Sequence, residues 1–230
     1  MRFDVLTLFP ELIESHMDFS IMKRASDEGV IEVVTHNPRD YTHDKHKKVD
    51  DTPYGGGAGM VLMPQPYVDC YEGVNRADNS LTIMMTPQGE PFTDNISNEL
   101  TQYDQIIILC GHYEGFDERI REIIKPREIS IGDFVLTGGE LPALCLIDSV
   151  SRKIDGTLGK IESAEDDSFS DGLLEYPHYT KPRNFRGLEV PDVLLNGNHK
   201  LINEFRQEQK IIRTKQKRPD LYERWKNKPI

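Results

Sequence analysis

Apolar and polar residues follow one another along the chain in blocks that predict strands separated by helices. Near-continuous apolar runs, such as residues 106–109, are typical of strands covered on both faces. Amphipathic spacing between these runs indicates helices. We expect strands at residues 3–9, 30–35, 81–86, 105–110 and 128–131, and helices at residues 11–28, 66–76, 94–102, 117–125 and 140–152. This alternation predicts an α/β fold with a mainly parallel sheet.

The pattern changes after Gly159. Residues 163–172 are polar, acidic and poor in core side chains, which is typical of a mobile linker. Beyond them, residues 198–214 have the apolar spacing of an amphipathic helix, and Pro219 limits the next helix to a start near that position. We therefore predict an α/β domain, an acidic linker and a small all-helical domain at residues 1–160, 161–173 and 174–230.

Composition indicates a soluble globular protein, with 37% hydrophobic and 29% charged residues among 230. The chain has no apolar run near the roughly 20 residues of a membrane span, and no signal-peptide pattern at its start. The three cysteines, Cys70, Cys110 and Cys145, are far apart and form no C-x-x-C motif. This pattern favours reduced thiols in a cytoplasmic protein and argues against a zinc site.

The charge of the chain is unevenly distributed. The net charge is −11, yet residues 199–230 hold ten Lys/Arg against four Asp/Glu, so this segment carries +6 and the remainder −17. An acidic body with a basic tail can still bind a polyanion locally. On charge alone, a solvated helix surface explains the tail equally well.

Three of the expected strands lead into segments rich in glycine, proline and polar residues. These segments are P-Q-G at residues 87–89, G-H-Y-E-G at 111–115 and G-D-F-V-L-T-G-G-E at 132–140. In a parallel sheet all three lie at the carboxyl edge, where open α/β sheets bind ligands, and glycine lets the backbone approach a ligand closely. One such segment alone would be read as a tight turn; three together favour a binding site. The dinucleotide-binding fingerprint G-x-G-x-x-G is absent after these strands.

Another glycine cluster, P-Y-G-G-G-A-G-M, occupies residues 53–60. It lacks the G-K-[ST] ending of a phosphate loop, and no hydrophobic strand precedes it, so nucleotide hydrolysis is not expected. We interpret it as a flexible loop beside a basic, histidine-containing surface. His43 and His46 in that surface have no partner cluster, so we read them as solvated and predict no metal site.

Several longer motifs carry a resemblance that covers nearly the whole chain. In order they are P-R-D-Y-T-H-D at 38–44, V-D-D-T-P-Y-G-G-G-A-G-M at 49–60, S-I-G-D-F-V-L-T-G-G-E-L-P-A at 130–143, D-S-V-S-R at 148–152, D-S-F-S-D-G-L-L at 167–174 and P-H-Y-T-K-P at 177–182. Each motif alone is weak evidence for a protein family, but all of them in this order and at this spacing are highly specific evidence. The sequence resembles the bacterial tRNA (guanine-N1)-methyltransferases, which methylate guanosine 37 beside the anticodon.

The resemblance implies a deep trefoil knot (SPOUT-like) in the α/β domain and S-adenosylmethionine as the cofactor. The three segments above would surround that cofactor. By position the resemblance implicates Pro87, Gly111, Tyr113, Glu114, Ile131, Gly132, Asp133, Phe134, Val135, Leu136, Gly138 and Gly139. Glycine-rich backbone can read an adenine edge while Ile131 and Leu136 cover its faces. The Glu114 carboxylate suits the sulfonium charge, or a magnesium ion near it.

The resemblance also assigns the chemistry to two residues. Asp167 would act as the general base that removes the N1 proton of guanine, and Arg152 would stabilise the negative charge that develops on the purine. Composition alone would treat Asp167 as one of several linker acids, and its D-S-F-S-D-G-L-L context distinguishes it from Asp166 and Asp171. Arg152 also suits the C-terminus of a helix, where a cation offsets the helix dipole.

The resemblance further implies a homodimer, in which the linker and helical domain of one subunit complete the cofactor site of the other. The basic residues of segment 210–218 are the natural contacts for tRNA phosphates, and segment 39–48 is a second candidate. Lys181 stands where relatives commonly have arginine. Because lysine lacks the bidentate fork of arginine, we assign no specific role to this position.

Two other functions fit parts of the sequence. A knotted methyltransferase that acts on ribose hydroxyls would not need the linker aspartate. A non-catalytic RNA-binding protein would have no need of the pair Asp167 and Arg152.

Overall fold

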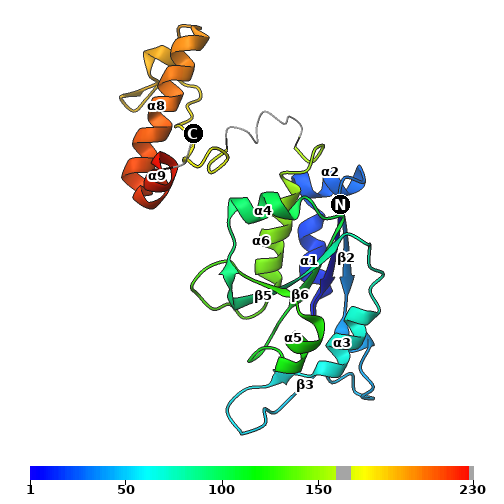
Figure 1. The fold of residues 1–230 in the computed structure, drawn as a ribbon. Coiled ribbons are helices and arrows are strands. Elements are labelled where there is room, and N and C mark those ends of the chain that lie inside the picture. The colour runs from blue at the N-terminus through cyan, green and yellow to red at the C-terminus, as the bar shows by residue number, and fades with distance from the viewer. Residues whose placement is uncertain (159–166, 228–230) are drawn as a thin grey trace. The chain divides into compact units, whose positions relative to one another are not determined.

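The computed structural model describes residues 1–158 and 167–227 of the chain. The chain divides into two compact units, Met1–Gly159 and Lys160–Ile230 (Figure 1). Within the described residues, no helix is both long enough and apolar enough to cross a membrane.

The first unit is built on a five-stranded parallel sheet. Its strands have the order β2-β1-β6-β5-β7, and each pairs with its neighbours in parallel. Their bounds are β1 (Arg2–Leu6), β2 (Glu32–His36), β5 (Ser80–Pro91), β6 (Gln105–Cys110) and β7 (Arg127–Ser130). Every residue of β6 is buried, because this central strand is covered on both faces. The predicted α/β fold with a mainly parallel sheet is confirmed.

Six helices cover the sheet in two layers (Figure 1). Buried side chains of α1 (Pro10–Met17), α2 (Ser20–Asp27), α4 (Asp94–Leu100) and α6 (Glu140–Ser151) belong to one core cluster. Those of α3 (Pro64–Glu72) and α5 (Glu118–Ile124) belong to the other. Alternate residues of β6 enter the two clusters, with Ile106 and Ile108 in the first and Ile107 and Leu109 in the second. The trefoil knot implied by the resemblance stays a prediction.

Two predicted elements near the N-terminus are wrong in extent. The single helix expected at residues 11–28 is two helices, because α1 ends at Met17 and Ser20 adopts a left-handed φ of 52°. An L-residue in that conformation interrupts the helical hydrogen bonds. The strand expected at residues 3–9 stops at Leu6, so Thr7 and Phe9 lie beyond the paired strand.

Strand β5 also differs from its prediction. It runs through the P-Q-G segment to Pro91 instead of ending at Thr86, and its pairing with β7 shifts register between Met85 and Glu90. Gly89 lies so close to β7 that an added Cβ would be 2.3 Å from the backbone nitrogen of Ile129. The predicted loop at 87–89 is therefore an irregular continuation of the strand rather than a separate turn.

Short elements complete the first unit. Strands β3 (Asp50–Asp51) and β4 (Val61–Leu62) form a small antiparallel hairpin that encloses the glycine cluster, and η1 (Pro38–Asp40) is one 3₁₀ turn. Cys70 and Cys110 are free and buried, and Cys145 is free and exposed.

The second unit contains α8 (His199–Lys217) and α9 (Pro219–Lys226), close to the predicted helices. It also contains a two-stranded hairpin, β8 (Asn184–Phe185) with β9 (Leu188–Glu189), and the 3₁₀ turn η2 (Asp192–Leu194). The hairpin was not predicted, because each strand has only two residues and both are exposed. The acidic linker prediction falls partly on residues 159–166, which lie outside the described part of the chain.

A candidate active site at the carboxyl edge of the sheet

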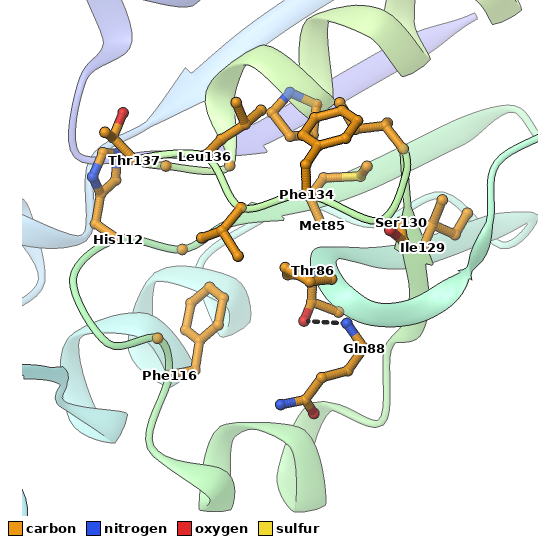
Figure 2. Close-up of a pocket in the computed structure, with 18 of the residues that line it drawn as sticks. Met85, Thr86, Gln88, His112, Phe116, Ile129, Ser130, Phe134, Leu136 and Thr137 are labelled. Carbon is orange, nitrogen blue, oxygen red and sulfur yellow. Dashed lines mark hydrogen bonds between the residues drawn. The ribbon is translucent and has the colours of Figure 1, made fainter.

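A pocket of about 270 Å³ lies at the carboxyl ends of β6 and β7, beside residues 85–88 of β5 (Figure 2). Most of its lining comes from the three segments that the sequence singled out. Eleven of the twelve proposed cofactor residues line it: Pro87, Gly111, Tyr113, Glu114, Ile131, Gly132, Phe134, Val135, Leu136, Gly138 and Gly139. Segments far apart in the sequence therefore meet at one place, as the parallel sheet requires.

Three proposed residues lie elsewhere. Asp133 is not part of the pocket lining. Arg152 is the C-cap of α6, at the helix end where the sequence placed it, and its backbone N–H donates to the Asp148 carbonyl. Asp167 belongs to the second unit, where its carbonyl accepts a 2.8 Å hydrogen bond from the Ser170 hydroxyl.

The pocket wall combines apolar side chains with short polar ones. Figure 2 shows Met85, Phe116, Ile129 and Phe134 around it, together with polar Thr86, Gln88 and Ser130. The Thr86 hydroxyl accepts a 3.3 Å hydrogen bond from the Gln88 backbone N–H. Such a wall suits a planar, partly polar ligand that needs few but well-placed hydrogen bonds.

Glycine is required at the junction of two of these segments. The Gly139 N–H donates to the Gly111 carbonyl at 2.9 Å, and a Cβ on Gly139 would lie 2.7 Å from the Cα of Cys110. A side chain at this position would push β6 away from the start of α6. The close contact explains why the sequence has glycine here.

The structure reveals polar partners that the sequence did not. Glu140, the first residue of α6, is buried, and its two carboxylate oxygens contact the Thr7 hydroxyl at 2.6 Å and the His112 Nε2 at 2.7 Å. Thr7 and Glu140 are 133 positions apart, and no spacing motif links them. Burial raises the pKa of the Cys110 thiol well above its ordinary value, and the charge of Glu140 raises it further.

The glycine cluster at 53–60 contacts one of the residues that line the pocket. The Glu114 N–H donates to the Met60 carbonyl at 2.9 Å, and Gly59 packs against the Glu114 side chain. This contact was missed because the sequence suggested only a flexible loop beside a basic surface. Within the described residues, no group of three or more His, Cys, Asp or Glu could hold a metal ion.

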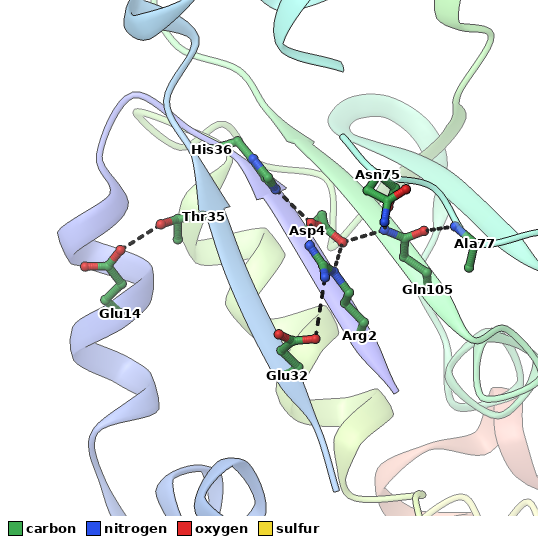
Figure 3. A network of polar contacts seen from close by, with 9 residues as sticks. All are labelled: Arg2, Asp4, Glu14, Glu32, Thr35, His36, Asn75, Ala77 and Gln105. Carbon is green, nitrogen blue, oxygen red and sulfur yellow. Dashed lines mark hydrogen bonds and ion pairs between the residues drawn. The ribbon is translucent and has the colours of Figure 1, made fainter. Parts of the chain in front are cut away.

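A second buried carboxylate, Asp4, lies on β1 away from the pocket lining (Figure 3). It accepts hydrogen bonds from Arg2 at 2.8 Å and Gln105 at 2.6 Å, and lies 2.7 Å from the His36 Nε2. Burial raises the pKa of Asp4, but hydrogen bonds from His36, Arg2 and Gln105 outweigh it and hold the pKa well below its usual range. The cluster joins β2, β1 and β6, so we interpret it as a structural feature that stabilises the sheet.

Comparison with known proteins decides the family. The chain matches the family described as tRNA (Guanine-1)-methyltransferase TrmD over residues 1–224. It belongs to this family. A tRNA (guanine-N(1)-)-methyltransferase from Clostridioides difficile is 56% identical over 227 residues, covering 97% of this chain and 98% of the relative. Proteins of the same name from Staphylococcus epidermidis and Desulforamulus reducens are 54% and 52% identical, covering 98% and 96% of this chain and 92% and 88% of theirs.

A methyltransferase of this family implies use of S-adenosylmethionine, and the pocket residues fit that ligand. Apolar side chains of Ile131 and Leu136 can cover an adenine, and the backbone of Gly111, Gly138 and Gly139 is open to a close approach. The Glu114 carboxylate lines the same pocket and supplies negative charge for a cationic ligand.

Proposed function

We propose that this protein transfers a methyl group from S-adenosylmethionine to N1 of guanosine 37 in tRNA. The observation that carries the proposal is the pocket at the carboxyl edge of the sheet, formed by three glycine-containing segments, in a chain that matches this methyltransferase family over nearly its full length. The cysteine pattern adds the proposal that the enzyme works in the cytoplasm.

The pocket binds and orients the methyl donor. Backbone groups around Gly111 and Gly139 would hold the adenine edge, and the apolar wall would exclude water from it. When bound, S-adenosylmethionine supplies an electrophilic methyl group on a sulfonium. A magnesium requirement is a separate part of the proposal. Activity measured with added magnesium and with a chelator tests it.

Asp167 and Arg152 act on the guanine. Asp167 takes the proton from N1, because protonated N1 is a poor nucleophile, and general bases contribute roughly 10²–10⁴-fold to such steps. The N1 electron pair then forms the bond to the methyl carbon while the carbon–sulfur bond breaks. Arg152 donates to the purine as negative charge develops on it.

Basic residues of α8 contact the tRNA backbone. Lys215 and Lys217 are exposed and Arg213 is partly exposed, so their charges are available to phosphates. Exposed cations of segment 39–48, among them Lys45 and Lys47, provide a second contact. Because N1 is inside the base stack, the target base must also be extruded to reach the pocket.

Two subunits form each active site in this proposal. Exposed Leu12 on α1 and Leu141 on α6, two helices that pack together, support an apolar interface on the first unit. Asp167→Asn and Gly139→Val should each be inactive alone, since one removes the base and the other blocks the pocket. Mixing the two should restore activity if subunits exchange and share sites. No recovery after co-refolding contradicts shared sites.

The direct test incubates the pure protein with radiolabelled S-adenosylmethionine and unmodified tRNA transcripts carrying either G37 or A37. The expected product is 1-methylguanosine in the G37 transcript alone, found by nuclease digestion and chromatography. Label on a ribose hydroxyl would instead support the ribose methyltransferase. Tight cofactor binding without transfer to any transcript would support a non-catalytic RNA-binding protein.

A further inference from the structure

A polar chain inside the first unit ties two of the pocket segments to the residue that follows β1. It consists of Thr7, Glu140 and His112, which we call the clamp. Glu140 is only 3% exposed, and its carboxylate oxygens lie 2.6 Å from the Thr7 hydroxyl and 2.7 Å from the His112 Nε2. His112 lines the pocket, and Figure 2 shows it beside Thr137 on the wall.

The hydrogen bonds of the clamp have a defined direction. The Phe9 N–H donates to the Thr7 oxygen at 2.9 Å, so the single hydroxyl proton of Thr7 faces Glu140. On the other side of the same carboxylate, the His112 Nε2 lies at 2.7 Å, where an Nε2 proton would be donated to Glu140.

The clamp is packed directly against the glycine segments. His112 pairs with Gly138 as an isolated β-bridge, and Gly139 donates to the Gly111 carbonyl at 2.9 Å. A Cβ on Gly138 would lie 2.3 Å from the His112 Nε2 and 2.5 Å from a Glu140 carboxylate oxygen. Any shift of the His112 ring therefore moves the segment that follows β7 relative to the segment that follows β6.

We propose that the clamp sets the spacing of these two segments, and that His112 in its neutral form makes the pocket favour the cationic methyl donor over its product, S-adenosylhomocysteine. This inference rests on the proposed function. Thr7, Glu140 and His112 are positioning residues here, since their contacts are with one another and with the pocket wall.

The preference follows from charge. The sulfur of the donor is a sulfonium, whereas the sulfur of the product is an uncharged thioether. Protonation of His112 adds positive charge to the wall of a small pocket, which opposes the donor more than the product. The other ionisable groups nearby are Glu140 on α6, Tyr113 beside His112, with ring centroids 6.2 Å apart, Glu114 and Arg121 in the lining, and the buried Cys110 thiol.

The spacing role is tested with His112→Ala and His112→Gln, because the glutamine amide can donate to Glu140 from the position of Nε2. Isothermal titration calorimetry with S-adenosylhomocysteine should show about tenfold weaker binding for His112→Ala, and binding within about threefold of wild type for His112→Gln. Equal affinity of all three proteins would overturn the spacing role. If His112→Ala does not fold, Thr7→Val replaces it. This variant removes the hydroxyl and so its hydrogen bonds with Glu140 and the Phe9 N–H, and weaker binding is again expected.

The charge role is tested by measuring the affinities of donor and product at about pH 5.5 and about pH 7.5. In the wild type, the preference for the donor should fall several-fold on acidification. In His112→Gln, the preference for the donor should change only by the amount that titration of the two ligands themselves causes. His36→Gln is the matched control, because His36 also contacts a buried carboxylate at 2.7 Å but does not line the pocket.

The outcomes separate the two proposals. Wild-type protein that binds neither ligand rejects the proposed function together with this inference. Wild-type protein that binds both ligands, with a donor preference that is equal at the two pH values or shifts equally in His112→Gln, overturns only the charge role.

Discussion

The two units of the chain bury very different numbers of apolar side chains. The first has two clusters of buried apolar residues, one on each face of its sheet. Among the described residues of the second unit, the buried apolar side chains are Leu173 and Tyr176, and beside them Lys210 and Thr214 are buried although polar. Lys210 pairs with Asp171 at 2.5 Å, and the Thr214 hydroxyl accepts from the Leu174 N–H at 2.8 Å.

This difference matches the tasks proposed for the two units. A cofactor pocket made of glycine backbone keeps its shape only if the residues around it are rigid. A close-packed core provides that rigidity. A small unit with few buried apolar residues has little stability of its own, so its order depends on polar contacts and on what it binds. Substitutions in the second unit should therefore leave the affinity for the cofactor unchanged. Substitutions in the first unit should leave the tRNA contacts of the second unchanged.

Asp167→Asn should have the largest effect. Loss of the base should lower turnover by roughly 10²–10⁴-fold, while the affinity for S-adenosylmethionine stays nearly unchanged because the pocket belongs to the first unit. Single-turnover methylation and calorimetry measure the two quantities. An unaffected rate would remove Asp167 as the base, and a large loss of cofactor affinity would break the division between the units. Asp171→Asn is the matched control for the chemistry.

Asp4→Ala tests the first unit. Its loss leaves Arg2 and His36 without their buried partner, so the free energy of unfolding should fall by about 3–5 kcal/mol. Urea titration monitored by circular dichroism measures it. Glu32→Ala, which removes only an exposed carboxylate 3.6 Å from Arg2, should cost less than about 1 kcal/mol. Similar losses for the two variants would contradict the role of the Asp4 cluster.

The stability difference between wild type and Asp4→Ala should also depend on pH. Because the pKa of Asp4 is lowered in the folded state, its charge stabilises the fold above the unfolded-state pKa of about 3.9. That contribution is lost as pH falls below this value toward the folded-state pKa. The difference in stability between wild type and Asp4→Ala should therefore be smaller at about pH 3 than at about pH 7. A stability difference between the two proteins that is equal or larger at about pH 3 would contradict the lowered pKa of Asp4.

Neutralising Arg213, Lys215 and Lys217 with glutamine tests the basic face of α8. We expect about tenfold weaker tRNA binding at moderate salt, and a salt dependence reduced by two to three counterions at most. Filter binding over a series of salt concentrations measures both. Lys23→Gln, an exposed cation of the first unit, is the control. Equal salt slopes in wild type and triple variant would mean that the phosphate contacts lie elsewhere.

Lys210→Met should have the smallest effect. The alkyl chain is kept but the ion pair with the partly exposed Asp171 is lost, so α8 should become less stable by about 1 kcal/mol. Hydrogen exchange should be faster in α8 and unchanged in β6. Lys200→Met, at an exposed position of the same helix, is the control. Faster exchange throughout the sheet would mean that the units unfold together.

Much of the fold could be predicted because local patterns dominate it. The apolar run at 106–109 identified β6, and the predicted bounds of 105–110 agree with the structure, since a strand covered on both faces has a continuous apolar centre. The break at Ser20 could not be foreseen, because the apolar residues of α1 and α2 keep helical spacing across it. The extension of β5 depends on contact with β7, which local sequence does not encode.

The site was predicted in part for a similar reason. Glycine-containing segments after parallel strands identify the pocket, because topology brings strand ends together. The clamp was not predicted, because a hydroxyl after β1 and a carboxylate on α6 become partners only through tertiary packing. His112 belongs to the G-H-Y-E-G segment at residues 111–115, but a histidine in a loop gives no sign of its partner.

The thiols of this chain differ in a way that is useful for spectroscopy. Burial raises the pKa of Cys70 to about 12 and that of Cys110 well above its ordinary value, so neither reacts readily with alkylating reagents. Cys145 is exposed on the outside of α6, the helix whose first residue is Glu140. A maleimide dye added to the unmodified protein would therefore label one known site, and its emission could report how this helix responds when small molecules or nucleic acids are added.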